Sequence, residues 1–582
     1  MSAATSAAAK PAHLHKRRFG FPRTGVLGVF LLVLAIAPLL LPPFYLTLLN
    51  YIGLYSLVAL GLVLLTGVGG LTSFGQAAFV GIGAYVTGAL TTKAIELPAG
   101  FAWAQGSPWI ALLAGLLLTL AIAGVLGALT LKLSGHYLPL GTIAWGISLY
   151  FMFGTFERLG GQTGLTGIPP ISLFGVSLES SSQIYYLIWA FLLLGAFTTQ
   201  NLLDSREGRA IRSLKGGMVM AEAMGVNTWR TRMVIFVIAA LQACASGWLY
   251  AHMQRFINPS PFGLQYGIEY LFMAVVGGAG QVWGALVGAG VVTLLKQWLQ
   301  DLLPRVLGRT GNFEVIVFGL LMILLLQRTR DGLWPLLAKL VPVRAPRRRV
   351  LAAAEPLPRR PMPPAGEVVL QAQSVTRKFG GLVANNAMSL EVRAGEILAL
   401  IGPNGAGKST MFNQLSGVDT PTSGEVIFRG QPVTGFTSRQ IAKLGLSRSF
   451  QHVRLLPKMS VLENVAIGAH LRGHRGVLSS AFRLDRAEEA RLLAEAAMQV
   501  ERVGLKDHLF DAAGSLALGQ QRTLEIARAL ASDPCLLLLD EPAACLRHKE
   551  NQALCYLLRK LRGDGMAVLL VEQDMDFVMG LE

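Results

Sequence analysis

The stretch Gly402-Pro-Asn-Gly-Ala-Gly-Lys-Ser409 decides the fold of the second half of this 582-residue chain. It has the spacing G-x(4)-G-K-S and follows the apolar run 397–401. Between a strand and a helix, the glycines let backbone N–H groups surround a β-phosphate, while Lys408 meets the β/γ charge and the Ser409 hydroxyl binds Mg²⁺. The stretch therefore predicts an α/β P-loop domain that binds a nucleoside triphosphate.

The first half of the chain is too hydrophobic for an ordinary soluble domain. The mean hydropathy of the whole chain is +0.50, and only 15% of its residues are charged. Residues 24–92 contain no charged side chain, which is enough for two spans and most of a third at about 20 residues each. A cleaved signal peptide has a much shorter apolar core. We therefore predict a polytopic α-helical membrane domain followed by the P-loop domain.

Apolar runs and composition divide the chain into four parts. A basic N-terminus covers 1–23, the membrane domain 24–330, a linker rich in Pro and Arg 331–366, and the P-loop domain 367–582. The seven prolines between 341 and 366 predict a semi-extended tether in that part of the linker. Ten spans are predicted, at 26–42, 45–66, 77–97, 108–133, 137–155, 183–200, 232–252, 265–276, 283–300 and 311–327.

The net charge of +17 reflects membrane topology more than a nucleic-acid partner. Basic clusters in 1–23 and in the linker flank apolar segments, and the basic loop 206–232 separates the sixth and seventh spans. The positive-inside rule places all three in the cytoplasm, which six plus four spans satisfy. No nucleic-acid-binding fold accompanies the clusters, so we expect no nucleic-acid partner. The four cysteines form no C-x-x-C pair, so we expect no metal or redox site among them.

Two apolar segments broken by glycine resemble each other: Gly75-Gln76-x(6)-Gly83-Ala84 and Gly280-Gln281-x(6)-Gly288-Ala289. Interrupted helices at matching places of two halves indicate a substrate pathway. Tight packing of helices through small residues explains the same pattern equally well. Both interpretations stay open at this point. The Gly-rich segment 160–170 is predicted to be an external loop that meets a partner.

Two further motifs complete the nucleotide machinery. The apolar strand 536–539 ends in Asp540 and Glu541, which would serve Mg²⁺ and, as general base, the attacking water. The turn at Gly519-Gln520 precedes a helical pattern and would aim N–H groups and the positive end of a helix at an anion.

With these motifs in order, residues 367–582 resemble the ATPase subunit of ATP-binding cassette (ABC) transporters. The resemblance implies ATP and Mg²⁺ as ligands, an adenine-stacking Phe379 and a Q-loop glutamine at Gln451. Phe-Gly-Gly-Leu, Leu-Ala-Leu-Gly-Gln-Gln-Arg and Asp-Glu-Pro-Ala-Ala are similar to the branched-chain amino acid importers. The expected nucleotide-binding residues are Phe379, Gly402, Asn404, Gly405, Gly407, Lys408, Ser409 and Thr410; the Mg²⁺ ligands Ser409, Gln451 and Asp540; the catalytic residues Glu541 and Gln573; and the signature turn Leu516, Ala517, Leu518, Gly519 and Gln520.

The membrane domain resembles the permeases of the same importers on separate residues. Ser73-Phe-Gly-Gln-Ala-Ala-Phe79, Gly81-Ile-Gly-Ala-Tyr85 and Val276-Gly-Gly-Ala-Gly280 carry the likeness. The loop around Arg209, Arg212, Glu222 and Gly225 is similar to their coupling segment, although a solvated basic loop is the alternative. The resemblance implies an inner-membrane protein with a cytoplasmic ATPase. It also implies partners: an extracytoplasmic solute-binding protein, a second permease, a second ATPase and the lipid bilayer.

Three departures from the family bear on ATP hydrolysis. The switch histidine of the family falls at Gln573, and the turn after Glu541 reads Ala543-Ala-Cys-Leu-Arg547 instead of the usual Gly and Asn or Asp. The chain ends at Glu582, so the resemblance implies a cassette that is incomplete at its C-terminus. Ala517 in place of the signature serine is common in this subfamily.

Several functions therefore compete. The leading hypothesis is ATP-driven import of a branched-chain amino acid or a related small solute, because the two glycine-broken segments are apolar and uncharged. Urea and short amides are alternative substrates. A subunit that binds ATP without hydrolysing it, for a regulatory or structural role, is a second hypothesis, and an ABC exporter is a weaker third.

Overall fold

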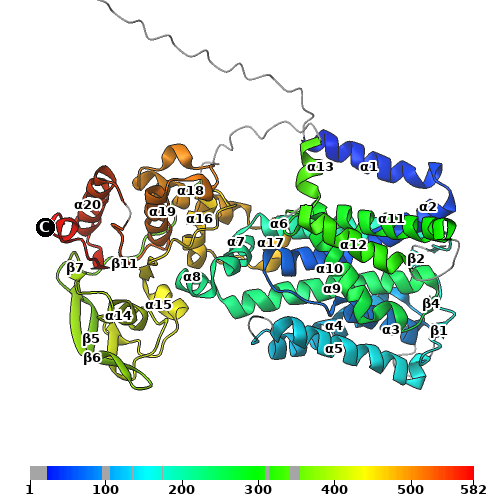
Figure 1. Cartoon of the computed structure of the whole chain (residues 1–582), viewed down its shortest axis with the longest axis horizontal. Helices are drawn as coiled ribbons and strands as arrows, with labels where there is room; N and C mark the ends of the chain where they lie inside the picture. Colours follow the sequence, from blue (N-terminus) through cyan, green and yellow to red (C-terminus); the bar gives the residue numbers. More distant parts are fainter. Residues whose placement is uncertain are drawn as a thin grey trace, which may run out of the picture.

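The computed structural model describes residues 23–92, 94, 105–133, 135, 137–173, 175–307, 313–328, 331–340, 354–544 and 546–581. Two bodies lie end to end along the long axis, a helical permease-like half and an α/β half (Figure 1). The expected N-terminal part, 1–23, lies outside the described residues except Arg23.

Ten helices of the first half fall on the ten predicted spans. They are α1 (Arg23–Leu40), α2 (Pro43–Leu62), α3 (Gln76–Thr91), α4 (Pro108–Thr130), α5 (Tyr137–Thr155), α6 (Ser181–Leu203), α9 (Thr228–Gln254), α10 (Leu264–Gly278), α11 (Val282–Leu307) and α12 (Phe313–Arg328). Within the described ranges, six segments are long and apolar enough to cross a membrane by length and composition. The short π-helix η1 (Val63–Val68) continues α2.

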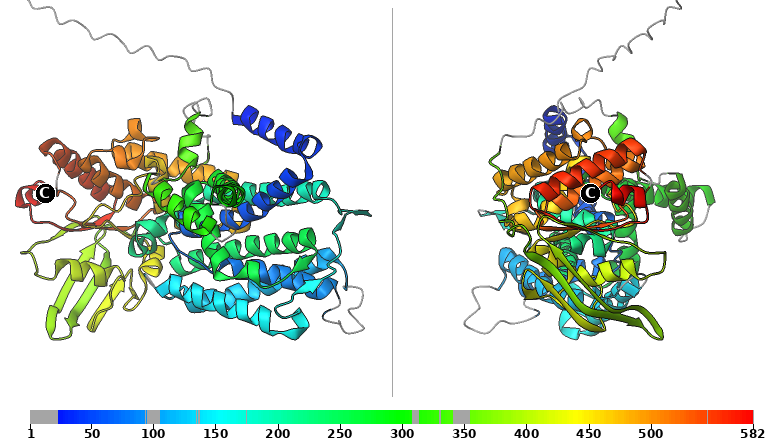
Figure 2. Two further views of the ribbon diagram at one scale, coloured as in Figure 1. Left: turned by 45° about the vertical axis from the view of Figure 1, so that its right-hand side comes forward. Right: turned by 90° about the vertical axis from the view of Figure 1, so that its left-hand side faces the viewer.

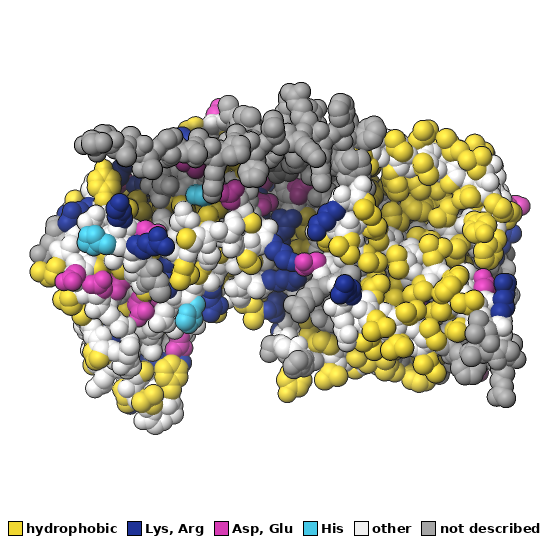
Figure 3. All heavy atoms as spheres, turned by 45° about the horizontal axis from the view of Figure 1, so that its top comes forward, with side chains coloured by type: hydrophobic (Ala, Val, Ile, Leu, Met, Phe, Trp, Pro, Cys, Tyr) yellow, Lys and Arg dark blue, Asp and Glu magenta, His cyan; other side chains and the backbone are white. Residues whose placement is uncertain are grey.

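The helices are arranged as a buried centre with an apolar outer surface. Helix α3 packs against α9, and nearly all of its residues are buried. Helices α4 and α5 instead expose large apolar side chains such as Leu117 and Phe151. Figure 3 shows hydrophobic side chains spread over this half, as a surface that faces lipid requires. The permease-like half therefore presents an apolar surface that suits contact with lipid.

Local signals set the helix boundaries in this half. Pro108 starts α4 at its first turn, where the missing N–H has no helical partner anyway. Ser180 and Gln183 form a capping box at the start of α6, and Asn227 caps α9. Two short helices, α7 (Arg206–Ser213) and α8 (Met218–Ala223), fill the basic loop between α6 and α9. At the opposite end, β1 (Leu165–Thr166) pairs with β4 (Phe256–Ile257), and β2 (Ser172–Leu173) with β3 (Val176–Ser177).

Two four-stranded sheets organise the α/β half. The parallel sheet has the order β10-β11-β12-β7 and the antiparallel sheet the order β6-β5-β8-β9. Their strands are β5 (Val368–Phe379), β6 (Leu382–Arg393), β7 (Ile397–Leu400), β8 (Ser423–Phe428), β9 (Gln431–Pro432), β10 (Leu446–Arg448), β11 (Leu536–Asp540) and β12 (Ala567–Val571). Strands β11 and β12 are buried throughout, as parallel strands covered on both faces are.

Helices cover the parallel sheet and extend beyond it as a separate layer (Figure 2). They are α14 (Lys408–Leu415), α15 (Ser438–Leu444), α16 (Val461–Gly468), α17 (Val477–Ala481), α18 (Arg486–Arg502), α19 (Leu518–Leu530), α20 (His548–Gly563) and α21 (Met575–Met579). One apolar core lies around α14 between the sheets, and another joins α16, α18 and α19. The phosphate loop and the signature turn belong to these two different layers.

The linker is more structured than its composition predicts. Helix α13 (Trp334–Leu340) lies inside the linker range 331–366, just before the predicted tether, and residues 341–353 lie outside the described part. Residues 354–366 have no helix or strand, yet they are anchored on the α/β half. Leu357 is buried in the core of α16 and α18, and Arg359 pairs with Glu495 and Asp533 at 3.2 Å. Side-chain anchors, which composition does not reveal, therefore fix this segment.

Candidate functional site

The phosphate loop joins β7 to α14 in a conformation that only glycine fits. Gly405 and Gly407 have φ values of +84° and +86°. A Cβ at Gly407 would come within 2.3 Å of the Ala384 carbonyl oxygen. Lys408 Nζ donates to the carbonyl oxygens of Gly402 and Pro403 at 2.6 and 2.8 Å. The lysine therefore lies across the loop, at the place where phosphate oxygens would compete for its donors.

Two carboxylates stand at the carboxyl end of β11. Asp540 is 4% exposed, and its Oδ1 has no hydrogen-bond partner in the described part of the chain. Burial raises the pKa of Asp540, and the nearby Arg448 guanidinium opposes this shift. Glu541 has a φ of +47°, a conformation that costs a non-glycine residue energy and often marks functional sites.

Glu541 is held between two glutamine side chains. Gln573 Nε2 donates to Glu541 Oε1 at 2.8 Å and to Asn404 Oδ1 at 2.7 Å. Gln451 Nε2 lies 3.4 Å from Glu541 Oε2. The structure thus brings together the two predicted catalytic residues, Glu541 and Gln573, with one residue of the phosphate loop and one expected Mg²⁺ ligand.

Glu572 and Ser449 support this cluster, and the sequence did not single them out. Glu572 accepts hydrogen bonds from the backbone N–H groups of Ala543 (2.7 Å) and Gln573 (3.0 Å), which ties the turn after Glu541 to β12. Burial raises the pKa of Glu572. The Ser449 hydroxyl accepts from the Asp540 N–H at 3.1 Å. Cys545 of the same turn lies outside the described residues.

The expected adenine-stacking residue stands at the end of β5. The Phe379 side chain is 48% exposed, and the Arg377 guanidinium lies 4.6 Å from the centre of its ring. Arg377 is fixed by Asp419 at 2.6 Å. One ring face is therefore covered by arginine, which leaves the other as the stacking surface for a base.

The signature turn forms the start of α19, away from the phosphate loop. Gln520 reaches back to accept from the Ala517 N–H at 3.1 Å, and Gln521 donates to the Leu516 carbonyl at 2.8 Å. Leu518 is exposed, and a Cβ at Gly519 would meet the Glu550 carboxylate at 2.6 Å. The turn presents the N-terminus of a 13-residue helix, which favours an anion.

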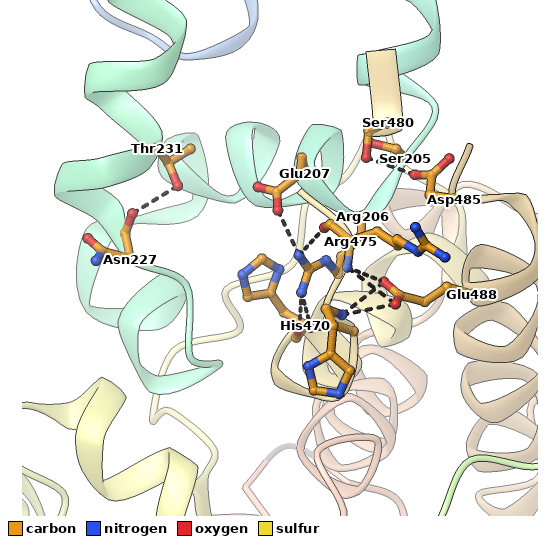
Figure 4. A network of polar contacts seen from close by, with 12 residues as sticks. Ser205, Arg206, Glu207, Asn227, Thr231, His470, Arg475, Ser480, Asp485 and Glu488 are labelled. Atoms are coloured by element: carbon orange, nitrogen blue, oxygen red, sulfur yellow. Dashed lines mark hydrogen bonds and ion pairs between the residues drawn. The ribbon is translucent and has the colours of Figure 1, made fainter. Parts of the chain in front are cut away.

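The basic loop between α6 and α9 docks on the α/β half (Figure 4). Arg206 donates to three backbone carbonyl oxygens there: His470 (2.9 Å), Arg475 (2.6 Å) and Gly473. The buried Arg209 forms a two-point ion pair with Glu489. Lys and Arg side chains gather where the two halves meet (Figure 3). The alternative interpretation of this segment was a solvated basic loop. Arg206 and Arg209 instead bind groups of the α/β half.

The other residues predicted for this loop have different contacts. Arg212 lies 3.8 Å from Glu463, and the Gly225 carbonyl accepts from Arg439 at 3.2 Å. Gly225 has a φ of +85°, and a Cβ there would strike the Leu471 side chain. Glu222 instead accepts from Thr228 within the loop, at 2.6 Å. Glu222 therefore shapes the loop, whereas the other three contact the α/β half.

An apolar contact connects this loop with the nucleotide site. Met220 and Met224 are buried in one cluster with Phe450 and with Leu456, Met459 and Ile467. Phe450 precedes Gln451, and the guanidinium of Arg448 lies 4.8 Å from its ring centre. Helix α8 therefore belongs to the same apolar cluster as Phe450, whose neighbour Gln451 contacts Glu541.

The two glycine-broken segments start helices, and the second break lies against the π-helix η1, which precedes the first. Gln76 begins α3, and Gln281 directly precedes α11. A Cβ at Gly67, in the π-helix, would lie 2.5 Å from the Gly280 nitrogen. Gly83 and Gly288 let backbone of neighbouring helices approach closely, which favours the packing interpretation for these two positions. Ser73 and Gln76 are buried with side-chain atoms that have no partner in the described ranges, so a polar pathway there stays a prediction.

Comparison with known proteins identifies both halves. Residues 44–326 match the family model of the branched-chain amino acid transport system permease component, and residues 385–544 match the ABC transporter model. The ATP-binding protein LivG of Escherichia coli K12, a high-affinity branched-chain amino acid transport protein, is 43% identical over 216 residues, which are 37% of this chain and 85% of LivG. The chain belongs to the ABC transporter family.

Two further relatives cover the same part of this ABC transporter. BraF of Pseudomonas aeruginosa, also a high-affinity branched-chain amino acid transport ATP-binding protein, is 40% identical over 37% of this chain and 85% of its own length. The crystal structure of a nucleotide-free cassette from an ABC transporter is 28% identical, covers 37% of this chain and 85% of that chain, and superposes with a TM-score of 0.33. The predicted fold class, the transport ATPase class and an inner-membrane location with a cytoplasmic cassette are confirmed.

Some contacts of this ABC transporter lie outside the motifs that sequence analysis used. Hydrogen bonds to backbone groups involve Arg206 and Glu572, and apolar packing involves Phe450. Neither kind of contact leaves a recognisable pattern of residues in the sequence. The ion pair of Glu269 and Lys296, described below, could have been found, because charged residues inside apolar helices are rare.

Proposed function

We propose that the chain is one half of an importer that uses ATP hydrolysis to bring a branched-chain amino acid or a related small solute into the cytoplasm. One observation gives the main support for energy coupling: Met220 of helix α8 shares an apolar cluster with Phe450, the neighbour of Gln451, and Gln451 lies beside Glu541. The permease match over residues 44–326 and the likeness to LivG and BraF support import and the substrate class.

In the proposed site, Lys408 and the loop N–H groups bind the phosphates, and Phe379 stacks on adenine. Glu541 accepts the proton of the attacking water, and Gln573 orients the γ-phosphate side. The residues present fit Mg²⁺, because Asp540 offers a buried oxygen without a partner in the described part of the chain, and the expected ligands Ser409 and Gln451 each offer another oxygen. Phosphate oxygens of the bound nucleotide would complete the ligands. Bound Mg²⁺ would neutralise phosphate charge.

The proposed assembly contains a second ATPase, a second permease and an extracytoplasmic solute-binding protein. Uptake of labelled leucine, urea and a dicarboxylate into vesicles that contain the assembled complex tests the substrate class. We expect leucine to be preferred, and preferred transport of the dicarboxylate would contradict the proposal. Preferred uptake of urea would assign the alternative substrate class.

A subunit that binds ATP without hydrolysing it is the second candidate. The hydrogen bonds of Gln573 to Glu541 and Asn404 favour it, because they occupy the carboxylate that would accept the proton. One experiment distinguishes the two functions: ATP hydrolysis is measured for a complex in which only this chain carries Glu541→Gln. A large loss of turnover supports the hydrolysing site, whereas unchanged turnover supports the second candidate.

A further inference from the structure

A cavity of about 210 Å³ lies inside the permease, between α2, α3, α9, α10 and α11. Tyrosines form much of its wall, among them Tyr51, Tyr55, Tyr250 and Tyr266. Glu269 and Lys296 are the acidic and the basic residue that line it. The cavity therefore offers one negative and one positive charge among aromatic and apolar side chains and a few neutral polar ones, Thr293, Gln297 and Gln300.

The two charges form an ion pair that remains partly open. Lys296 Nζ lies 2.9 Å from Glu269 Oε1 and 3.1 Å from Oε2. The lysine side chain keeps 31% of its surface exposed and the glutamate 12%, and the ammonium lies 5.5 Å from the centre of the Tyr266 ring. Charges inside membrane helices are costly, and they generally serve a substrate, an ion or a partner. These two stand one on α10 and one on α11.

The pair is not needed to hold α10 and α11 together. Their backbones already approach so closely that a Cβ at Gly288 would lie 1.8 Å from the Met273 carbonyl oxygen. A Cβ at Gly277 would lie 1.8 Å from the Gly284 carbonyl oxygen. Glycine contacts of this kind supply the packing on their own, so the ion pair is free for another purpose.

The cavity lies in the part of the membrane domain that is remote from the cassette. Helix α9 starts at Thr228, beside the docked loop, and Tyr250 is about 33 Å further along its axis at about 1.5 Å per residue. Lys296 is about 21 Å along α11 from Val282, the first residue of that helix. Gly278, at the break before α11, lies next to Asp331, which pairs with Lys458 of the cassette. The cavity is thus placed to receive a solute from the extracytoplasmic side.

We propose that this cavity binds the head group of a free, zwitterionic amino acid. The α-ammonium replaces Lys296 at the Glu269 carboxylate, and the α-carboxylate replaces Glu269 at Lys296, so one ion pair becomes two. The Thr293 hydroxyl lies one helical turn before Lys296, is buried and has no partner within the described ranges, so it can donate to the same carboxylate. This inference rests on the proposed import of an amino acid and assigns the groups that recognise it.

The apolar wall and the size of the cavity suit a branched aliphatic side chain. Val80, Met273 and Val292 line it next to the tyrosine rings. A cavity of about 150 Å³ already accepts benzene, so about 210 Å³ leaves room for a small amino acid. Because the site holds equal numbers of both charges, a solute with net charge would leave one of them unpaired.

Binding of labelled L-leucine to the purified complex, without ATP and without a solute-binding protein, tests the assignment. The competitors are 4-methylpentanoate, which lacks the ammonium, and 3-methylbutylamine, which lacks the carboxylate. We expect each to bind at least about tenfold more weakly than leucine. Glu269→Gln should remove the advantage of leucine over 4-methylpentanoate, and Lys296→Gln its advantage over 3-methylbutylamine.

Control variants separate recognition from folding. Lys458→Gln removes an exposed ion pair elsewhere and should leave both ratios unchanged. The double variant Glu269→Gln with Lys296→Gln leaves no unpaired charge, so it should fold and lose both ratios even if the single variants do not fold. If folded variants kept the wild-type ratios of leucine affinity to competitor affinity, the proposed site would be wrong. Leucine uptake by the wild-type complex would in that case still support import. A wild-type complex that imports urea and not leucine would overturn the proposed substrate class and this assignment together.

Discussion

At the scale of single residues, the Glu541 carboxylate accepts hydrogen bonds from two glutamine amides, one after each strand that neighbours β11. Gln451 follows β10 and Gln573 follows β12, and these strands flank β11. The amide of Gln573 also holds Asn404 of the phosphate loop. The proposed base is thus fixed in position, but one of its oxygens is engaged by a neutral donor that must yield when the attacking water binds.

We expect Gln573→His to raise the ATPase rate of complexes that contain this chain. An imidazole offers a rigid donor that can polarise the γ-phosphate, whereas the glutamine amide is neutral and turned toward Glu541 and Asn404. The gain is bounded by the roughly 10² to 10³ that one catalytic donor supplies. Steady-state ATP hydrolysis measures it, with Glu541→Gln on the same background as the control. No increase would place the limitation elsewhere in the site.

We expect Lys408→Ala to abolish ATP binding by this cassette at micromolar nucleotide. The variant removes the cation that spans the phosphate loop, and loss of a charge-assisted hydrogen bond costs about 3 kcal/mol, roughly a hundredfold in affinity. Photolabelling with an ATP analogue measures the loss. The exposed Lys443→Ala is the matched control and should bind normally. Transport that survived Lys408→Ala would favour the non-hydrolysing candidate.

The sequence predicts which residues form the nucleotide site, but it does not predict most of the contacts between them. Lys408, Asp540 and Glu541 lie near each other because parallel strands place their carboxyl ends at one edge of the sheet. The bridge from Gln573 to Asn404 depends on side-chain rotamers, which no spacing encodes. Glu541's left-handed backbone was also not predictable, because a non-glycine residue there contradicts local preference.

At the scale of elements, α7 and α8 connect the membrane helices to the cassette. They have eight and six residues, too few for helical periodicity to identify or for isolated helices to persist. Tertiary contacts therefore stabilise them: Arg209 with Glu489, and Met220 in its apolar cluster. This explains why the sequence predicts a basic loop at this place and not two helices.

We expect Arg209→Met to reduce transport while ATP binding persists. The variant leaves the Glu489 carboxylate without its partner in a mostly buried interface, which costs up to about 3–5 kcal/mol. Leucine uptake per ATP hydrolysed measures the effect. The double variant Arg209→Met with Glu489→Met should recover part of the loss, because neither charge is then unpaired. Lys458→Gln, at an exposed pair, should have little effect.

We expect acid to weaken this interface through His470. Burial, together with Arg206 and Arg209, lowers the pKa of His470 to about 3. The docked state therefore holds neutral imidazole, so its stability is full above pH 6.5 and falls below it, by up to about 1.4 kcal/mol per pH unit. Thermal unfolding between pH 7.5 and 5, above the ordinary pKa values of Asp and Glu, measures the slope. His470→Gln should flatten it, and an equal slope in that variant would exclude His470 as the cause.

At the scale of the whole molecule, the proposed assembly has this chain contribute its phosphate loop to one nucleotide site and its signature turn to another. The phosphate loop belongs to the layer around α14, and the signature turn starts α19 in the layer of α16 and α18. The proposed second ATPase would bring its own signature turn to this chain's phosphate loop, and its phosphate loop to Gly519. The separation of the layers was not visible in the sequence, since both motifs fall within one continuous domain.

We expect Gly519→Asp in this chain to reduce hydrolysis at the partner's phosphate loop and to leave this chain's own ATP binding intact. The variant adds a carboxylate at the N-terminus of α19, beside Glu550, where the helix dipole would otherwise meet a phosphate. Photolabelling of each chain and total hydrolysis report the two effects, and the loss of turnover should be on the order of 10². Gly563→Asp, on the open end of α20, is the matched control. If Gly519→Asp instead removed labelling of this chain alone, the signature turn would serve its own phosphate loop, and the head-to-tail assembly would be wrong.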